Sequence, residues 1–297
     1  MLAKLYRNIV PEKTRKVIYK AFLGSLLMLI RDFEGTMRWY WCKLYYSIIS
    51  PKNEKEQAYK AWGIAGNSPY PYIWKKEYDL QHYEINIDTT NNLPYVVHNG
   101  KKLYFKRDMV ASAESTYRGL LIEQDKRSAH RYVSSYEELK GKTLLDIGAA
   151  EANFTLDTIE YIDHAYLFEC DEAWIEALEA TFAPWKDKIT IVRKYVSDVD
   201  NEDNITLDSF IQDQGMDINN LFLKMDIEGY ERKALDGAVY ILGHGEHISG
   251  SVCIYHLHDD KEVIGAKLKN LNLKTRIQPG YLYFEKEMRL AIMQFWR

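Results

Sequence analysis

The residues best suited to catalysis lie in and directly after a short apolar segment, LFLKMD, in the second half of the chain. Lys224, Asp226, Glu228 and Glu231 place four charges within eight residues. An unpaired ammonium within a buried strand is costly, so we expect Asp226 or Glu228 to pair with Lys224. The favourable effect of a helix dipole on first-turn acids would account for Glu231 alone. The run therefore predicts a functional site.

Two imidazoles and two carboxylates follow the next apolar segment, SGSVCIYH. His256, His258, Asp259 and Asp260 could supply a general base, or the nitrogen and oxygen ligands of a divalent metal. We expect only one of the two histidines to face the cleft. We expect His256 and Asp226 to act together, either as bases or as ligands of a divalent cation such as Mg²⁺.

The stretch TLLDIGAAEANFTL, residues 143–156, has the form of a nucleotide-binding turn that lacks glycines. A dinucleotide pyrophosphate is bound by GxGxxG, whereas this turn has one glycine, Gly148. Asp146 and Glu151 would repel a phosphate and would attract an ammonium group. The turn therefore predicts a cofactor without phosphates, such as S-adenosylmethionine. The residues expected to bind it here are Asp146, Gly148, Glu151, Asn153 and Phe154.

Two further polar positions follow predicted strands. Glu169, in FECD, comes 23 residues after Asp146, where an acid can accept hydrogen bonds from the ribose hydroxyls of an adenosine. Its neighbour Cys170 belongs to the same expected cofactor site. Ser197 and Asp198 follow a third strand and could bind an adenine, although Ser-Asp in a turn needs no ligand.

The elements that must position these residues alternate between strand and helix. Five apolar segments are predicted strands, and helical spacing separates them: TLLDI, HAYLFEC, KITIVRKYV, LFLKMD and SGSVCIYH. Such alternation predicts a parallel α/β sheet covered on both faces. LKTRIQ, GYLYFEK and LAIMQFWR follow with little room for helices, so the sheet should finish with an antiparallel pair. We expect a mainly helical N-terminal region over residues 1–107 and the α/β domain over 108–297.

Composition limits the class of partner. The net charge of −4 argues against a nucleic-acid binder, and the three cysteines show no metal-ligand spacing, as expected of free thiols in a reducing cytoplasm. Residues 1–51 carry a net charge of +6, and RWYWCKLYY, residues 38–46, interleaves aromatics with cations. Residues 1–50 could therefore contact the inner face of a membrane or a partner protein. The alternative is that their apolar faces pack on the rest of the protein.

Several of these motifs together resemble the FkbM-type methyltransferases, over about residues 100–297. The motifs that carry the resemblance are LLDIGAAEANFTL, YLFECD, ITLDSF, LFLKMDIEGYERKALDGA, CIYHLHDD and GYLYF. The resemblance implies a Rossmann-like methyltransferase sheet and methyl transfer from S-adenosylmethionine to hydroxyl groups, commonly of sugars and polysaccharides. It places Asp226 where cofactor and acceptor meet, with Lys224 keeping Asp226 ionised. The expected acceptor-binding residues are Glu123, Gln124, His130, Arg131 and His258.

The sequence departs from the family pattern at one position, and two functions other than methyl transfer are alternatives. Ala152 stands where the family pattern has glycine, and its methyl group should narrow the turn. An NAD-dependent oxidoreductase would share the acid at Glu169 but would need more glycines. A catalytically silent scaffold with the same fold would account for Ala152 and for the basic, aromatic N-terminus.

Overall fold

The computed structural model describes residues 33–297. The apolar segment AFLGSLLMLI, residues 21–30, lies outside the described residues. Contacts divide the chain into two compact units, residues 1–73 and 74–297. We expected the α/β domain to begin at residue 108, and the contacts include residues 74–107 in the same unit. Among residues 33–297, no helix has the length and apolar character that spanning a bilayer requires.

The smaller unit contains two packed helices, α4 (Phe33–Ile48) and α5 (Glu54–Ala65). Asn53 caps α5 by accepting a hydrogen bond from the backbone N–H of Glu56, at 2.9 Å. Trp62 is fully buried, and a Cβ at Gly63 would lie 2.9 Å from the Cα of Lys43, so the helices approach closely. The contact of residues 1–50 with a membrane or a partner stays a prediction.

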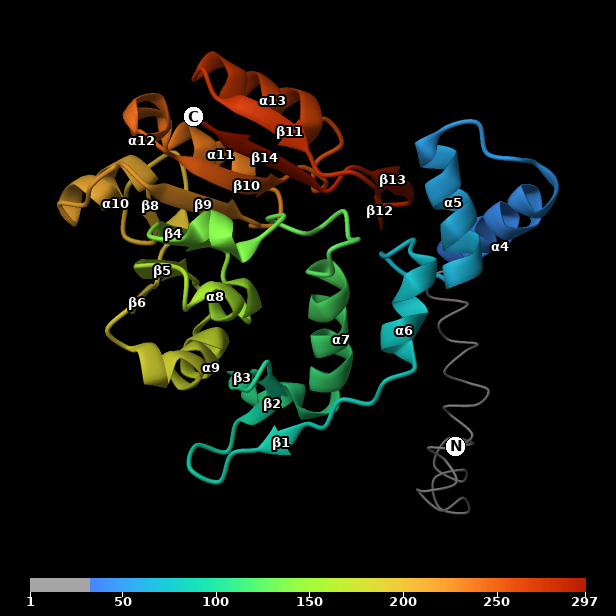
Figure 1. The fold of residues 1–297 in the computed structure, drawn as a ribbon, viewed down its shortest axis with the longest axis horizontal. Coiled ribbons are helices and arrows are strands. Elements are labelled where there is room, and N and C mark those ends of the chain that lie inside the picture. The colour runs from blue at the N-terminus through green and yellow to red at the C-terminus, as the bar shows by residue number, and fades with distance from the viewer. Residues whose placement is uncertain (1–32) are drawn as a thin grey trace, which may run out of the picture. The chain divides into compact units, whose positions relative to one another are not determined.

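The larger unit is built on a seven-stranded sheet (Figure 1). Its order is β11-β14-β10-β9-β4-β5-β6. The strands are β4 (Thr143–Ile147), β5 (His164–Phe168), β6 (Ile189–Val192), β9 (Leu221–Met225), β10 (Ser249–Cys253), β11 (Lys274–Ile277) and β14 (Ile292–Trp296). β4, β5, β6, β9 and β10 are parallel, and β14 is antiparallel to both β10 and β11. The predicted parallel sheet with an antiparallel C-terminal pair is confirmed.

The helices of this unit connect the strands in the predicted alternation. They are α6 (Lys76–Asp79), α7 (Ala113–Glu123), α8 (Asn153–Thr158), α9 (Glu172–Phe182), α10 (Leu207–Asp213), α11 (Glu231–Asp236), α12 (Val239–His244) and α13 (Asp260–Asn270), with 3₁₀ turns at 73–75, 107–111, 136–139 and 183–185. Trp174, Leu178 and Phe182 are all buried, so the apolar stripe of α9 packs in the core.

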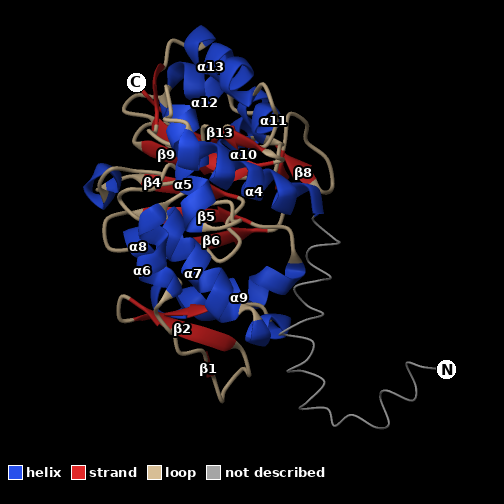
Figure 2. Ribbon diagram, turned by 90° about the vertical axis from the view of Figure 1, so that its right-hand side faces the viewer, coloured by secondary structure: helices blue, strands red, loops and turns tan. Residues whose placement is uncertain are grey.

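Short strands lie outside the main sheet. β1 (Asn86–Ile87), β2 (Pro94–His98) and β3 (Lys101–Tyr104) form a small antiparallel sheet, which Figures 1 and 2 show apart from the main one. Asn99 and Gly100 turn the β2–β3 hairpin with φ of 50° and 80°, as the Asn-Gly pair predicts. β7 (Tyr195–Val196) pairs with β8 (Asn204–Ile205), and β12 (Leu282–Phe284) with β13 (Glu287–Arg289). GYLYFEK therefore belongs to a separate ribbon, and β11 is the sheet partner of β14.

Gly250, the second residue of β10, gives a direct test of this packing. An added Cβ would lie 2.4 Å from the carbonyl oxygen of Leu223 and 2.4 Å from Cζ of Phe295. We expect Gly250→Ala to lower the free energy of unfolding by about 1–3 kcal/mol, measured by chemical denaturation. Gly243→Ala is the matched control, because Gly243 lies in α12 and its added Cβ would make only an ordinary contact, 3.9 Å from Leu271. Gly243→Ala should be neutral or stabilising by about 0.5–1 kcal/mol. Equal effects of the two changes would contradict this packing.

Candidate active site

The site lies where the carboxyl ends of β4 and β9 meet, the edge at which open α/β sheets bind ligands. Gly148 has φ of +79°, and an added Cβ would lie only 2.0 Å from the carbonyl oxygen of Asp226. The N–H of Asp226 donates to the carbonyl of Ile147 at 3.1 Å. The single glycine of the turn is therefore required by the close approach of two backbones.

The turn after β4 contains two alanines in the left-handed region. Ala150 has φ of 45° and Ala152 has φ of 52°. A left-handed alanine costs roughly 1–2 kcal/mol relative to its usual conformation, which gives the physical reason for the glycine expected at position 152. Ala152 is buried and its N–H donates to the carbonyl of Ala149 at 2.7 Å. The alanine thus fits the turn at the cost of backbone strain.

Glu169 stabilises this turn from the end of β5. One carboxylate oxygen accepts the N–H of Ala150 at 2.9 Å, and the other accepts the N–H groups of Cys170 and Asp171 at 2.8 Å each. Glu169 therefore fixes the position of the strained turn relative to β5. Its carboxylate is half-buried and lies beside the turn, where a ribose was expected.

The partner of Lys224 differs from the one expected. Its ammonium pairs with Asp146 Oδ1 at 3.0 Å and donates to the carbonyl of Gly148. Burial lowers the pKa of a lysine, but Asp146 and then Asp226 raise the pKa of Lys224, which stays charged. Asp146 also accepts a hydrogen bond from Thr155 at 2.6 Å. The expectation that Asp226 or Glu228 pairs with Lys224 was wrong, because the neighbouring parallel strand presents Asp146 directly opposite.

Glu151 and Asp146, both expected to attract an ammonium group, lie in different environments. Asp146 is buried beneath the turn and paired with Lys224. Burial raises the pKa of Glu151 from its ordinary value to about 7, with a further upward contribution from Glu123. Glu151 is therefore a carboxyl that a nearby cation would ionise, whereas Asp146 already has its cation.

Asp226 is the centre of the polar cluster. Its Oδ2 accepts a hydrogen bond from Tyr132 at 2.8 Å and lies 3.6 Å from His130 Nε2, while Oδ1 lies 3.6 Å from His256 Nε2. Burial raises the pKa of a carboxyl, but His130, Lys224, His256 and Tyr132 together lower the pKa of Asp226 to about 2. Asp226 is thus an anion bracketed by two imidazoles.

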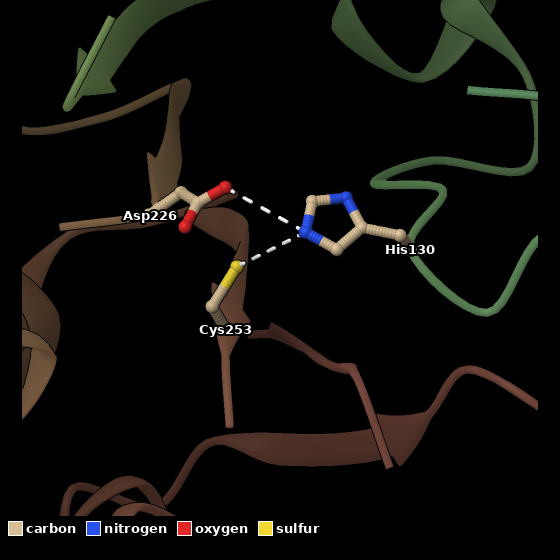
Figure 3. Close-up of side chains that lie close together, drawn as sticks. All are labelled: His130, Asp226 and Cys253. Carbon is tan, nitrogen blue, oxygen red and sulfur yellow. Dashed lines mark hydrogen bonds and ion pairs between the residues drawn. The ribbon is translucent and has the colours of Figure 1, made fainter. Parts of the chain in front are cut away.

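Cys253 completes the His130 side of the cluster. Its Sγ lies 3.9 Å from His130 Nε2, and Figure 3 shows the side chains of His130, Asp226 and Cys253 converging. Burial, followed by the charge of Asp226, raises the pKa of the Cys253 thiol well above its ordinary value. Cys253 is therefore a neutral thiol, in agreement with the prediction of free cysteines.

Glu231 organises the His256 side. It is fully buried and its Oε1 lies 2.8 Å from His256 Nδ1. The same carboxylate accepts the N–H groups of Ile227 and Gly229, at 2.9 and 3.0 Å. These bonds close the loop after β9, in which Glu228 has φ of 54° and Gly229 has φ of 98°. The interpretation of Glu231 as a first-turn acid favoured by the helix dipole did not predict its contacts with His256 and with this loop.

The two histidines after β10 lie in different environments, because β10 ends at Cys253 and both histidines belong to the irregular loop that follows. His256 is buried, and Glu231 with Asp226 and Glu228 raises its pKa against the opposing effect of burial. His258 is 81% exposed and contacts Glu287 at 2.8 Å. Glu228 Oε2 lies 3.6 Å from His256 Nε2, and its side chain is 85% exposed. The loop thus brings Glu228 to the open side of the cluster, with His256 beneath.

The expected acceptor-binding residues are only partly brought to the site. His130 joins the Asp226 cluster. Gln124 and Arg131 are buried, and an Arg131 N–H donates to the carbonyl of Gln124 while its guanidinium stacks on Tyr136. The contacts of Gln124 and Arg131 are thus with the protein itself. Glu123 is the last residue of α7, and its charge raises the pKa of Glu151.

The remaining expected cofactor residues lie in several elements, and the strand before Ser197, β7, belongs to a separate two-stranded sheet. The hydroxyl of Ser197 is buried and donates to Asp198 at 3.0 Å, directly after β7. Asn153 begins α8, and Cys170 follows Glu169. Phe154 is fully buried against the rings of Tyr132 and Phe222, so it contributes to the core beneath the turn.

The strand order, with one antiparallel strand at β14 and a cofactor-type turn after β4, defines a Rossmann-like methyltransferase fold. A model of the methyltransferase FkbM domain matches residues 97–255, which is more than half of the chain. The chain therefore belongs to the FkbM methyltransferase family.

The solved structures that are similar to this chain include the following three, all at low identity. The methyltransferase FkbM of Methylobacillus flagellatus KT is 19% identical with a TM-score of 0.42, covering 52% of this chain and 44% of that one. The M. jannaschii TYW2 complex with AdoMet is 12% identical with a TM-score of 0.40, covering 68% and 85%. A SAM-dependent O-methyltransferase of Thermotoga maritima is 13% identical with a TM-score of 0.33, covering 52% and 58%. None of the curated proteins matches the chain.

The buried pair of Lys224 and Asp146 can be tested by removing one partner. Lys224→Met leaves the Asp146 carboxylate buried without its cation, so we expect the free energy of unfolding to fall by about 3–5 kcal/mol, measured by chemical denaturation. Lys233→Met is the control, because Lys233 is exposed on α11 and should change stability by no more than about 0.5 kcal/mol. A loss below about 1 kcal/mol in Lys224→Met would contradict the assigned pair.

Proposed function

We propose that this protein transfers the methyl group of S-adenosylmethionine to a hydroxyl oxygen of a sugar, a polysaccharide or a related small scaffold. The observation that carries the proposal is the ionised Asp226, bracketed by His130 and His256, beside the turn that contains Glu151. Family membership supports methyl transfer in general. The hydroxyl specificity rests on the oxygen and imidazole groups of this cluster.

The residues of the turn fit a cofactor with an ammonium group. Glu151 is a half-buried carboxyl with a pKa of about 7, so its partial burial disfavours its charge and a bound ammonium would restore it. Glu169 would accept the ribose hydroxyls, and Ser197 with Asp198 would lie near the adenine. Asp146 supports the turn through Lys224, so we assign the ammonium contact to Glu151.

When bound, S-adenosylmethionine supplies a methyl group activated on a sulfonium, and the acceptor oxygen forms the new C–O bond as the C–S bond breaks. A hydroxyl is a poor nucleophile at neutral pH, so its proton must pass to a base as the bond forms. Asp226, with its pKa of about 2, would orient the hydroxyl by accepting its hydrogen bond, and His256 in its neutral form is the group placed to receive the proton. Glu231 would orient His256.

A catalytically silent scaffold predicts a different result when cofactor binding to the protein is measured. A silent scaffold would bind no cofactor at millimolar concentration, because nothing would maintain the turn for a ligand. The ionised and bracketed state of Asp226 favours catalysis, since a pKa shifted this far is common in active sites.

Cofactor affinity should depend on pH through Glu151. Because its pKa in the free protein is about 7 and a bound ammonium lowers it, binding releases a proton. We expect the affinity for S-adenosylhomocysteine to rise by about tenfold between pH 5.5 and 7.5 and then to level off, measured by calorimetry. Glu151→Gln should remove the slope. Glu172→Gln, at an exposed acid of α9, should keep it. A wild-type affinity independent of pH would overturn the assignment of Glu151.

Asp226→Asn tests the catalytic centre. We expect the rate of methyl transfer to fall by about 10²–10⁴-fold, with S-adenosylhomocysteine binding retained. The readout is incorporation of label from methyl-labelled S-adenosylmethionine into a glycan-enriched extract, with a mass increase of one methylene group in the product. Asp213→Asn, at an exposed acid ending α10, is the control and should keep full activity. Methyl transfer by Asp226→Asn at the wild-type rate would contradict the proposed centre.

A further inference from the structure

His256 has a ring nitrogen that no group in residues 33–297 satisfies. Its Nδ1 contacts Glu231, but its Nε2 is buried and has no hydrogen-bond partner. This nitrogen lies 3.6 Å from Asp226 Oδ1 and 3.6 Å from Glu228 Oε2. A buried polar atom without a partner is costly, and a group bound beside these two carboxylates would satisfy it.

The separations of the two carboxylate oxygens from His256 Nε2 are those of ligands that share one metal ion. Two ligand atoms that each lie about 2.1 Å from an ion are about 3.0 Å apart at a right angle and about 3.4 Å apart at the tetrahedral angle. Both observed separations are 3.6 Å. Glu228 would have to turn towards Asp226 for all three atoms to reach one ion, and its side chain, which is 85% exposed, is able to do so.

Glu231 provides the support that a metal-binding histidine requires. Such histidines usually donate their other ring N–H to a carboxylate, which fixes the tautomer and the ring orientation. The contact between Glu231 and Nδ1 does this and directs Nε2 towards Asp226 and Glu228. Glu231 also binds the backbone of the loop that presents Glu228.

Charge favours a cation at the same point. Asp226, Glu228 and Glu231 all lie within 3.6 Å of the His256 ring, and Lys224 pairs with Asp146 instead. Three carboxylates around one imidazole leave an excess of negative charge that a divalent cation would balance.

We propose that Asp226, Glu228 and His256 bind one divalent cation of the Mn²⁺ or Mg²⁺ class, with Glu231 as the positioning residue. Two carboxylates and one imidazole are ligands typical of such ions, and three ligands leave positions open for water and an acceptor oxygen. The exposed side of Glu228 gives access to those positions.

His130, Asp226 and Cys253 form a second group of donors in reach of one another (Figure 3). The Asp226 oxygen on that side, Oδ2, already accepts the hydroxyl of Tyr132 at 2.8 Å. The thiol of Cys253 is fully buried, so an ion there would have no open position towards an acceptor.

Asp226, Glu231 and His256 are the other group of donors in reach of one another. Glu231 already contacts His256 Nδ1 and accepts two backbone N–H groups, so the exposed Glu228 is the carboxylate able to complete a site at His256 Nε2.

The role of the cation rests on the proposed function. By coordinating the acceptor oxygen it would polarise the hydroxyl, whose proton would leave to water on the exposed side. The oxygen would then form the bond to the methyl carbon as the C–S bond breaks. In this arrangement His256 is a ligand, and the cation replaces it as the group that activates the hydroxyl.

The test is a titration of the full chain with Mn²⁺. Binding is measured as the decrease in the electron paramagnetic resonance signal of free Mn²⁺. We expect one Mn²⁺ per chain, and at least about tenfold weaker binding in Glu228→Gln, His256→Ala and Glu231→Gln. Glu228→Gln changes an exposed side chain, so it stays informative if a buried variant does not fold. His258→Ala is the matched control, since His258 is an exposed histidine of the same loop with its own carboxylate partner, and Mn²⁺ binding should be unchanged.

Three results would overturn the cation site. They are no Mn²⁺ binding by the wild type, equal weakening in His258→Ala, and weakening by Cys253→Ser without weakening by Glu228→Gln. Binding of S-adenosylhomocysteine, measured on the same preparation, separates the two proposals. Methyl transfer that persists in EDTA would reject the cation and keep the methyltransferase. Mn²⁺ binding without S-adenosylhomocysteine binding would keep the site and reject the proposed function.

Discussion

The buried ion pair between Lys224 and Asp146 is the interaction on which the site depends. It joins β4 and β9, the two central strands, at the point where both end. Because Lys224 also donates to the carbonyl of Gly148, one side chain fixes the turn after β4 against the loop after β9. The residues that follow these strands, Glu151 and Asp226, are therefore positioned relative to each other by a contact that neither of them makes.

Backbone strain accompanies this arrangement. Ala150, Ala152 and Glu228 all have positive φ, and each lies in a loop at the carboxyl edge of the sheet. Such conformations persist when surrounding contacts compensate for them. Glu169 provides this for the turn after β4, and Glu231 provides it for the loop after β9. Two buried or half-buried glutamates thus maintain two strained loops, which explains how the chain accepts alanine where glycine is usual.

The sequence predicted the fold well, because the fold follows from local patterns. Strand–helix alternation predicts a parallel sheet, and parallel strands bring the residues that follow them to one edge. Which charges pair could not be predicted, since Asp146 and Asp226 are both near Lys224 and only the register of β4 with β9 selects between them. Tyr132 was missed because it lies in an irregular segment before β4, where no periodicity indicates the direction of a side chain. Glu231 was misread because its contact with His256 joins residues 25 positions apart.

The most direct test of the central claim, that this edge binds S-adenosylmethionine, is calorimetry of the full chain at pH 7.5 with S-adenosylhomocysteine and, separately, with NADH. The account predicts one S-adenosylhomocysteine per chain and no heat of binding with NADH. Binding of NADH, or no binding of S-adenosylhomocysteine at millimolar concentration, would contradict it.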